Sequence, residues 1–201
     1  MKGKRIWEIG GFLAGVVLIL FGVAAIFMGA SGYSTTRDSI KNEGITFGTS
    51  DDPAVAKYAS QWAGDQVKTG DQARAFAKVM RAHTLEATGG LTYAAMGRYQ
   101  AAAKPDDPAG TNDENAAAKD ANGQPVANGA RNIWVTETAL TTALNVSYMA
   151  ERLSVFGIVV GIALLLTGVG LVILAFAVFG REPSLGESTQ RPGSPASVTP
   201  G

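Results

Sequence analysis

Two long apolar runs without a charged residue, Phe12–Ala30 and Val155–Phe179, constrain this chain more than any other feature. At a rise of about 1.5 Å per residue, a helix is about 28 Å long over the first run and about 37 Å over the second, against a hydrocarbon core of roughly 30 Å. A backbone inside lipid has to satisfy its polar groups within its own segment, which a helix does. We therefore expect a membrane protein with two transmembrane helices.

The two spans divide the chain into five parts and predict an all-α fold. The part between them has room for one small domain with a modest core. No helix breaker separates the end of this domain from the second span, so one long juxtamembrane helix is predicted to begin near Asn132 and continue into that span. The predicted parts are a cytoplasmic N-terminal tail (1–11), the first span (12–30), a helical domain (31–152) with a loop at 104–129, the second span (153–180) and a disordered tail rich in Pro, Ser and Gly (181–201).

Basic residues close to the spans favour one orientation in the membrane. More of them lie beside the two tails than at the ends of the intervening domain, and the side richer in Lys and Arg is usually cytoplasmic. We therefore expect both termini in the cytoplasm and residues 31–152 outside it. The basic residues on the tail side are Lys2, Lys4, Arg5, Arg181 and Arg191, and those on the domain side are Arg37, Lys41 and Arg152.

A cleaved signal peptide is the alternative for the first run. Basic residues precede the run and small residues end it, as in a signal peptide. Against this, the run is longer than the usual apolar region of about 7–15 residues, and Met28-Gly29-Ala30-Ser31 is a poor cleavage site. The second run anchors the protein in either case.

The composition excludes several classes of function. The formal net charge is +0, which argues against a nucleic-acid partner, because such binding depends on neutralising phosphates. The chain has no cysteine, which excludes disulfides, zinc–thiolate sites, iron–sulfur clusters and cysteine nucleophiles. A domain outside the cytoplasm without disulfides fits a bacterial envelope, so we expect the protein in the bacterial plasma membrane.

Glycines recur along one stripe of each span, mostly seven residues apart. Small residues on a stripe let helix backbones approach closely, which drives helix association inside a membrane. The alternative is that glycine is simply common in membrane helices. We predict a helix–helix contact, within one chain or between copies, that uses Gly11, Gly15, Gly22, Gly29, Gly157, Gly161 and Gly168.

The domain is predicted to start with a connector and a first helix. Residues 31–50 are rich in Gly, Ser and Thr, which is typical of a connector. Asp52 then offers an N-cap and Pro53 suits the first helical position, so a helix is predicted from here to about Val67.

A second helix is predicted over 71–87, ended by two glycines, and a shorter one over 92–103. The second helix has an apolar face that is expected to point into the core. Its basic face is expected to be solvated, with anionic lipid headgroups or a partner as the alternative. The apolar face consists of Ala73, Phe76, Ala77, Met80, Thr84 and Ala87, and the basic face of Arg74, Lys78 and Arg81.

Residues 104–129 have little apolar bulk and are predicted to form a long surface loop. Their acids do not have the spacing of a calcium-binding loop, so a solvated acidic loop is favoured over a calcium site. The helix from 132 to 152 then has a broad apolar arc and an opposite polar stripe. The arc consists of Val135, Ala139, Leu140, Ala143, Leu144, Val146 and Leu153, and the stripe of Thr138, Thr141, Thr142, Asn145 and Arg152.

His83 is the only histidine and the main candidate for any chemistry. It lies at the edge of the apolar face of the second predicted helix, three residues before Glu86. A transition-metal site would need carboxylates that converge on it from elsewhere, and no nucleophile motif supports a catalytic triad. We expect a packed or hydrogen-bonded histidine, and neither a catalytic, metal nor cofactor site.

Three segments resemble those of a family of actinobacterial two-span membrane proteins: Met80–Gly90, Ala130–Leu140 and Tyr148–Glu151. The resemblance covers most of the chain and implies the same layout, with both termini in the cytoplasm. It implies no settled activity and no site residues. Chains of this family are sometimes labelled aromatic ring-opening dioxygenases, but that reaction needs two histidines and a carboxylate on iron, and this chain has one histidine.

Together these features predict a non-enzymatic envelope protein that acts through protein–protein contacts. It would be an accessory subunit of a membrane complex or a self-assembling scaffold, and its expected partners are membrane lipids, another membrane protein or copies of itself. The alternative is a homo-oligomeric two-span channel or pore. Neither span carries an ionisable side chain in its core, so such a pore would be lined by glycine and aliphatic groups and gated by dewetting.

Overall fold

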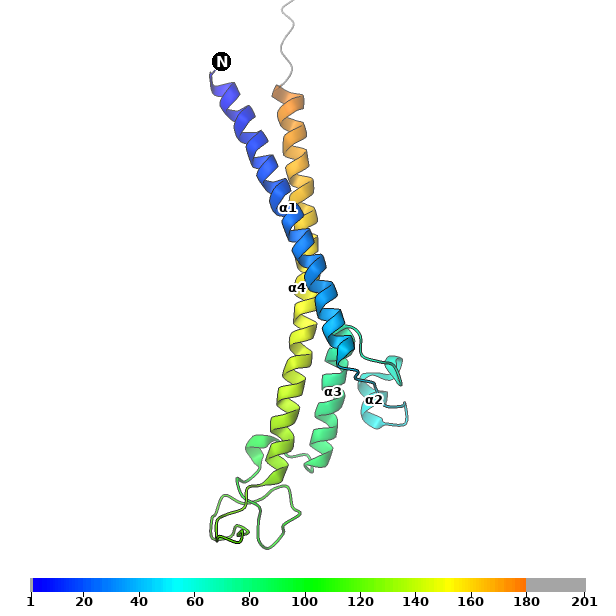
Figure 1. The fold of residues 1–201 in the computed structure, drawn as a ribbon, viewed down its shortest axis with the longest axis vertical. Coiled ribbons are helices and arrows are strands. Elements are labelled where there is room, and N and C mark those ends of the chain that lie inside the picture. The colour runs from blue at the N-terminus through cyan, green and yellow to red at the C-terminus, as the bar shows by residue number, and fades with distance from the viewer. Residues whose placement is uncertain (1, 180–201) are drawn as a thin grey trace, which may run out of the picture. The chain divides into compact units, whose positions relative to one another are not determined.

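The computed structural model describes residues 2–179 as a helical protein (Figure 1). Both predicted spans lie in helices that are long and apolar enough to cross a membrane. Within the described residues, β pairing occurs only as isolated bridges. The tail predicted to be disordered, 181–201, lies outside the described residues. The elements are α1 (Lys2–Asn42), α2 (Pro53–Tyr58), the 3-10 helix η1 (Ser60–Trp62), α3 (Gly70–Ala87), the 3-10 helix η2 (Tyr93–Ala95) and α4 (Gly129–Phe179).

The chain divides into two compact units, and α1 and α4 contribute to both. The smaller unit consists of the first part of α1 and the last part of α4, with boundaries at Leu20 and Leu164. Inside it, the rings of Phe12 and Phe176 meet edge to face with centroids 5.8 Å apart. The larger unit, Phe21–Ala163, holds all the remaining elements.

Helix α1 does not end with the first apolar run, and the predicted connector over 31–50 is wrong in its first part. The helix continues to Asn42, twelve residues past Ala30. The hydroxyls of Ser34 and Ser39 donate to carbonyls of their own helix, so these polar side chains are satisfied without breaking it. The local composition of residues 31–42 favours a loop, but the contact of Arg37 with Glu151 of α4 holds them in the helix.

The first domain helix begins as predicted and ends early. The Asp52 carboxylate accepts from the backbone N–H groups of Ala54 and Val55, at 2.8 and 3.4 Å, which confirms the N-cap. Helix α2 ends at Tyr58 instead of near Val67. Val67 lies in an extended segment, where its N–H donates to Ile45 O at 2.8 Å. This backbone pairing with a segment more than twenty residues earlier replaces the continued helix.

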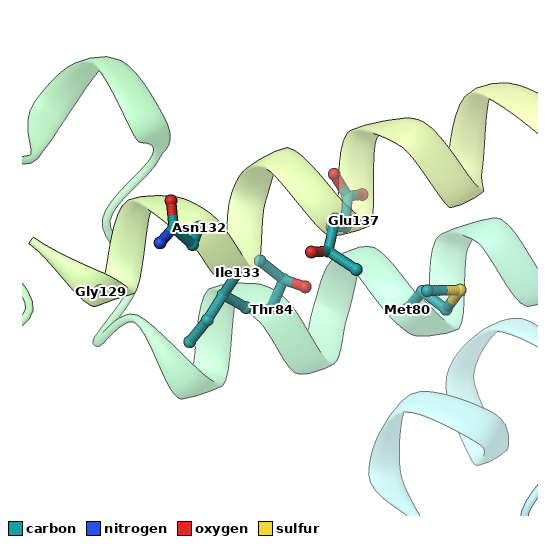
Figure 2. A pocket seen from close by; sticks show the side chains of 7 residues that line it. Met80, Thr84, Gly129, Asn132, Ile133 and Glu137 are labelled. Carbon is teal, nitrogen blue, oxygen red and sulfur yellow. The ribbon is translucent and has the colours of Figure 1, made fainter.

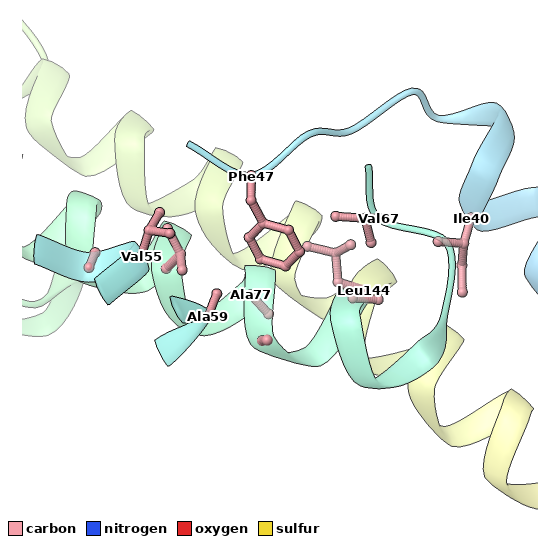
Figure 3. Packing of buried hydrophobic residues seen from close by; sticks show 11 residues of the cluster. Ile40, Phe47, Val55, Ala59, Val67, Ala77 and Leu144 are labelled. Atoms are coloured by element: carbon pink, nitrogen blue, oxygen red, sulfur yellow. The ribbon is translucent and has the colours of Figure 1, made fainter. Parts of the chain in front are cut away.

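Three segments pack together to form the core of the larger unit: α2, α3 and the stretch of chain that follows α1 (Figure 3). Val55 and Val67 have no exposed surface, and Phe47 is 2% exposed. The Phe47 ring stacks on Trp62 and meets Phe76 edge to face, with centroids 6.1 and 5.4 Å apart. Small side chains on α3 let these elements approach one another closely.

Helix α3 matches its prediction within one residue, and the helix predicted after it is wrong. Thr69 caps α3 by accepting from Gln72 N–H at 3.2 Å. The basic face is exposed as expected, whereas Ala87 is exposed instead of buried. Residues 92–103 form only the short helix η2 and then extended backbone, because Tyr99 pairs with both Thr111 and Ala127.

The predicted loop at 104–129 has a fixed path made by backbone hydrogen bonds. Gln100 N–H donates to Val126 O and Ala118 N–H donates to Gln100 O, at 2.9 and 2.8 Å. The Asn128 side chain donates to Gly97 O and Pro108 O, both at 3.0 Å, and accepts from Ala130 N–H at 3.1 Å. Asn128 therefore closes the loop and caps the start of α4.

Helix α4 confirms that one continuous helix runs from the end of the predicted domain through the second apolar run. Its predicted apolar arc, however, is not the side that is buried: only Leu144 of that arc is buried. The residues that α4 buries before the second span are Trp134, Glu137, Leu144 and Glu151, which we call the inner row.

Truncation of Phe47 should destabilise the larger unit strongly. Phe47→Ala removes a ring packed on two aromatic side chains, and large-to-small changes of this kind cost about 3–5 kcal/mol. Unfolding of the full chain in mild detergent, followed by tryptophan fluorescence, measures the loss. Tyr58→Ala is the control, because Tyr58 is 36% exposed. Equal stability of the two variants would contradict this packing.

Candidate functional site: a buried carboxylate and the faces of α4

The Glu151 carboxylate joins three helices. Arg37 of α1 donates from Nε to Oε2 at 3.3 Å and from a terminal nitrogen to Oε1 at 3.4 Å. The backbone N–H of Gly70, at the start of α3, donates to Oε2 at 2.8 Å. Glu151 is 6% exposed, so water competes little for these bonds. The negative charge also lies at a helix N-terminus, where the helix dipole favours it.

Gly70 allows α3 to begin directly against α4. A Cβ at this position would lie 2.9 Å from the Tyr148 Cα and 3.2 Å from the Glu151 Cβ. Beside this contact, Arg152 donates to both oxygens of Asp71, at 2.6 and 2.7 Å. The start of α3 is thus held by a backbone hydrogen bond to the buried Glu151 carboxylate and by the exposed ion pair of Asp71 with Arg152.

A second contact lies at the other end of α3. The Trp134 indole donates to Leu91 O at 2.9 Å and lies 3.3 Å from the Thr88 hydroxyl. Thr88 is fully buried, and its hydroxyl lies within 2.8 Å of Thr84 O and Leu91 O. Since Gly70 meets Glu151 and Thr88 meets Trp134, α3 runs antiparallel to α4 and is fixed at both ends.

Glu137 is the other buried acid of the inner row, at 4% exposure (Figure 2). Its Oε2 accepts from the Thr138 hydroxyl at 3.3 Å. It borders two hollows between α3 and α4. One, of about 430 Å³, also has Met80, Thr84 and Ile133 in its walls.

The other hollow, of about 310 Å³, contains the predicted basic face. Its walls combine Arg74, Lys78 and Arg81 of α3 with Thr141 and Asn145 of α4. The Arg74 guanidinium stacks over the Tyr148 ring and that of Arg81 over Trp134, at 4.7 and 5.0 Å from the ring centroids. Two residues of the predicted polar stripe of α4, Thr141 and Asn145, therefore face the basic face of α3.

A third hollow, of about 400 Å³, is apolar and lies where α1 ends. Ile40 and Ile45 border it from the chain around the end of α1, Phe76 and Met80 from α3, and Leu140 and Leu144 from α4.

Five of the seven predicted packing glycines are buried. In the larger unit, a Cβ on Gly29 would lie 2.7 Å from Ser154 O, and one on Gly161 would lie 2.8 Å from Gly22 O. In the smaller unit, a Cβ on Gly15 would lie 2.8 Å from Gly168 O, and one on Gly168 would lie 2.6 Å from Gly15 O.

The other two predicted glycines have more room. A Cβ on Gly157 would be in ordinary contact with the Gly29 Cα at 3.8 Å, and one on Gly11 would meet nothing within 4 Å. The close contacts of the other five lie within one chain, between α1 and α4.

His83 contacts Asp52 and not Glu86, the acid three residues after it in the sequence. Its Nε2 lies 2.8 Å from Asp52 Oδ2 and links α3 to the cap of α2. This hydrogen bond, with those from Ala54 and Val55, holds the pKa of the Asp52 carboxyl below its ordinary value of 3.8.

The acids of the loop act as acceptors within their own turns. Asp107 accepts from Ala109 N–H, Asp113 from Asn115 N–H, and Asp120 from Asn122 N–H, at 2.8 to 2.9 Å. The Tyr99 hydroxyl donates to Glu114 at 2.9 Å, which raises the pKa of that hydroxyl. In the part of the chain that the structure describes, no three His, Asp or Glu side chains are grouped to hold a metal ion.

The exposed side of α4 before the second span carries no charge and includes large apolar side chains. From Asn132 to Ala150 the only charged residue is Glu137, which is buried. Val135, Val146 and Met149 are 57%, 56% and 66% exposed. A helix face in contact with water usually presents charged side chains, and this face presents none.

Sequence reasoning missed the buried acids Glu137 and Glu151. Amphipathic patterning assigns charged side chains to the solvent side of a helix. A signal was present in the spacing, because Glu137, Leu144 and Glu151 follow one another at intervals of seven residues. The partner of Glu151, Arg37, comes from a segment predicted to be a connector, so this ion pair between α1 and α4 was not accessible from either helix alone.

Comparison with protein-family models, with curated proteins and with solved structures gives no match for this chain. The family resemblance of the three sequence segments therefore stays a prediction.

Substitution of Gly70 by alanine should separate the start of α3 from α4. The added methyl group would lie too close to Tyr148, and forcing it into packed structure costs about 1–3 kcal/mol. Faster hydrogen exchange at the start of α3, measured on the full chain, reports the change. Gly129→Ala is the control, since a Cβ there meets nothing within 4 Å. Unchanged exchange in both variants would refute the close approach.

Gly161→Ala should weaken the contact between α1 and α4 in the larger unit. Its methyl group would meet backbone atoms of Gly22 and Ile26, both at 2.8 Å, which cannot move without shifting the helix. We expect a lower unfolding temperature in detergent, with Gly170→Ala unchanged because nothing lies within 4 Å of that position. A Gly161→Ala variant as stable as Gly170→Ala would show that the helices do not pack this way.

The α2 segment should loosen in acid. Because the folded-state pKa of Asp52 lies below 3.8, its contribution is fully present above that pH and disappears as the pH falls through the lower folded value. The loss of this stabilisation is measured by hydrogen exchange at Ala54 and Val55 between pH 5 and pH 2.5, corrected for intrinsic rates. Asp52→Asn keeps an N-cap acceptor and should remove this pH dependence. If that variant kept the same pH dependence, a group other than Asp52 would be responsible for it.

Proposed function

We propose that this chain is a non-enzymatic envelope membrane protein that acts through protein–protein contacts. In this proposal α1 and α4 cross the bacterial plasma membrane, both termini are cytoplasmic, and residues 31–152 lie outside. The protein then serves as an accessory subunit of a membrane complex or as a self-assembling scaffold.

The observation that supports this proposal is the exposed apolar face of α4 ahead of the second span. Water-exposed surfaces rarely keep large contiguous apolar patches unless a partner or a ligand covers them, and the centres of protein interfaces are depleted in charge. The internal contacts add support. The two ends of α3 are fixed on α4 by Glu151 and Trp134, so the helix that presents this face is held in place.

The test is the native mass of the protein after gentle extraction from its own membrane, with companions identified by mass spectrometry. The proposal predicts a species heavier than one 20.8 kDa chain, made of copies or of a defined companion. A strictly monomeric protein with no reproducible companion would contradict it. A ring of copies that conducts ions in planar bilayers would favour the alternative, a homo-oligomeric channel.

A further inference from the structure

Seven exposed residues of α4, six of them apolar, follow a heptad pattern. They occur at alternating intervals of four and three residues, which places them in one row along the helix. We call this row, which consists of Val135, Ala139, Thr142, Val146, Met149, Leu153 and Phe156, the outer row; all seven are exposed.

The outer row lies away from the rest of the chain. At about 100° per residue, its centre is about 150° around α4 from the inner row, whose members contact α3 and α1. Thr142, which the sequence placed in a polar stripe, is part of this row and is the one polar member. The largest side chains of the row are more than half exposed, from 56% at Val146 to 70% at Leu153.

This geometry specifies a helical partner that runs along α4. An a/d heptad row packs against another helix through knobs in holes, over about three heptads here. We propose that the partner is the outer row of α4 in a second copy of this chain. The inference rests on the proposed function, since two copies inserted in the same orientation have parallel α4 helices. Each outer row then meets its own counterpart across a two-fold axis.

The surface area and the charges are compatible with such a pair. Val135, Val146 and Met149 precede the second span, and Leu153 and Phe156 continue the row at its start. Five large side chains that each lose about 100 Å² bury on the order of 1,000 Å² over two copies, which reaches the lower limit of specific interfaces. The positions that flank the row are uncharged except Arg152, whose guanidinium is bound by Asp71. No like charges therefore oppose one another along the row.

Single-cysteine cross-linking in native membranes tests the pairing, because the chain has no cysteine of its own. Val146→Cys and Met149→Cys should form a disulfide-linked dimer on mild oxidation. Leu140→Cys is the matched control: it is 48% exposed but lies about 150° from the outer row. We expect at least five-fold more dimer at the two outer-row positions. Equal cross-linking at all three would indicate random collision and overturn the inference.

A photo-cross-linking residue at position 146 separates this inference from the proposed function. Capture of a second copy of the chain supports the pair. Met149→Asp should abolish this capture without changing the unfolding temperature. Capture of a different protein, with no disulfide dimer, overturns the second copy and leaves the proposed function standing. Neither a disulfide dimer nor capture of any protein overturns both.

Discussion

The hydrogen-bonded ion pair of Arg37 and Glu151 is the interaction on which the larger unit depends most. A carboxylate taken out of water loses several kcal/mol of hydration, so it has to be matched by good donors. Two guanidinium N–H groups and the first N–H of α3 supply them. The same contact fixes where α3 begins and holds the end of α1, which polar composition alone would leave as a loop.

The arrangement of α4 follows from this contact. With Glu151 turned toward α1 and α3, the residues one and two heptads earlier, Leu144 and Glu137, also face inward. The outer row is then left on the outside of the helix. Buried acids inside and exposed apolar side chains outside are the reverse of an ordinary amphipathic helix. The internal polar contacts thus fix the single chain, while the outer row remains for a partner.

Much of the fold could be predicted from the sequence because its signals are local. The lengths of the apolar runs predict two helices able to cross a membrane, Asp52-Pro53 predicts a helix start, and the lack of a breaker after Asn132 predicts one long α4. The rest depends on residues far apart in the chain. The extension of α1 requires Arg37 to meet Glu151, and the predicted helix over 92–103 stops at η2 because Tyr99 pairs with Thr111 and Ala127. The face that α4 buries was missed because patterning assumes that apolar residues point inward, and the seven-residue spacing of three of its buried residues was the only signal for it.

A double-mutant cycle between Arg37 and Glu151 tests the central claim most directly. Arg37→Gln, Glu151→Gln and the double variant would each be unfolded in the same detergent. If the pair holds α1 to α4, each single change should be destabilising and the double variant should lose less than their sum, by about 2 kcal/mol. Additive losses within about 0.5 kcal/mol would contradict the account, because the two side chains would then act independently.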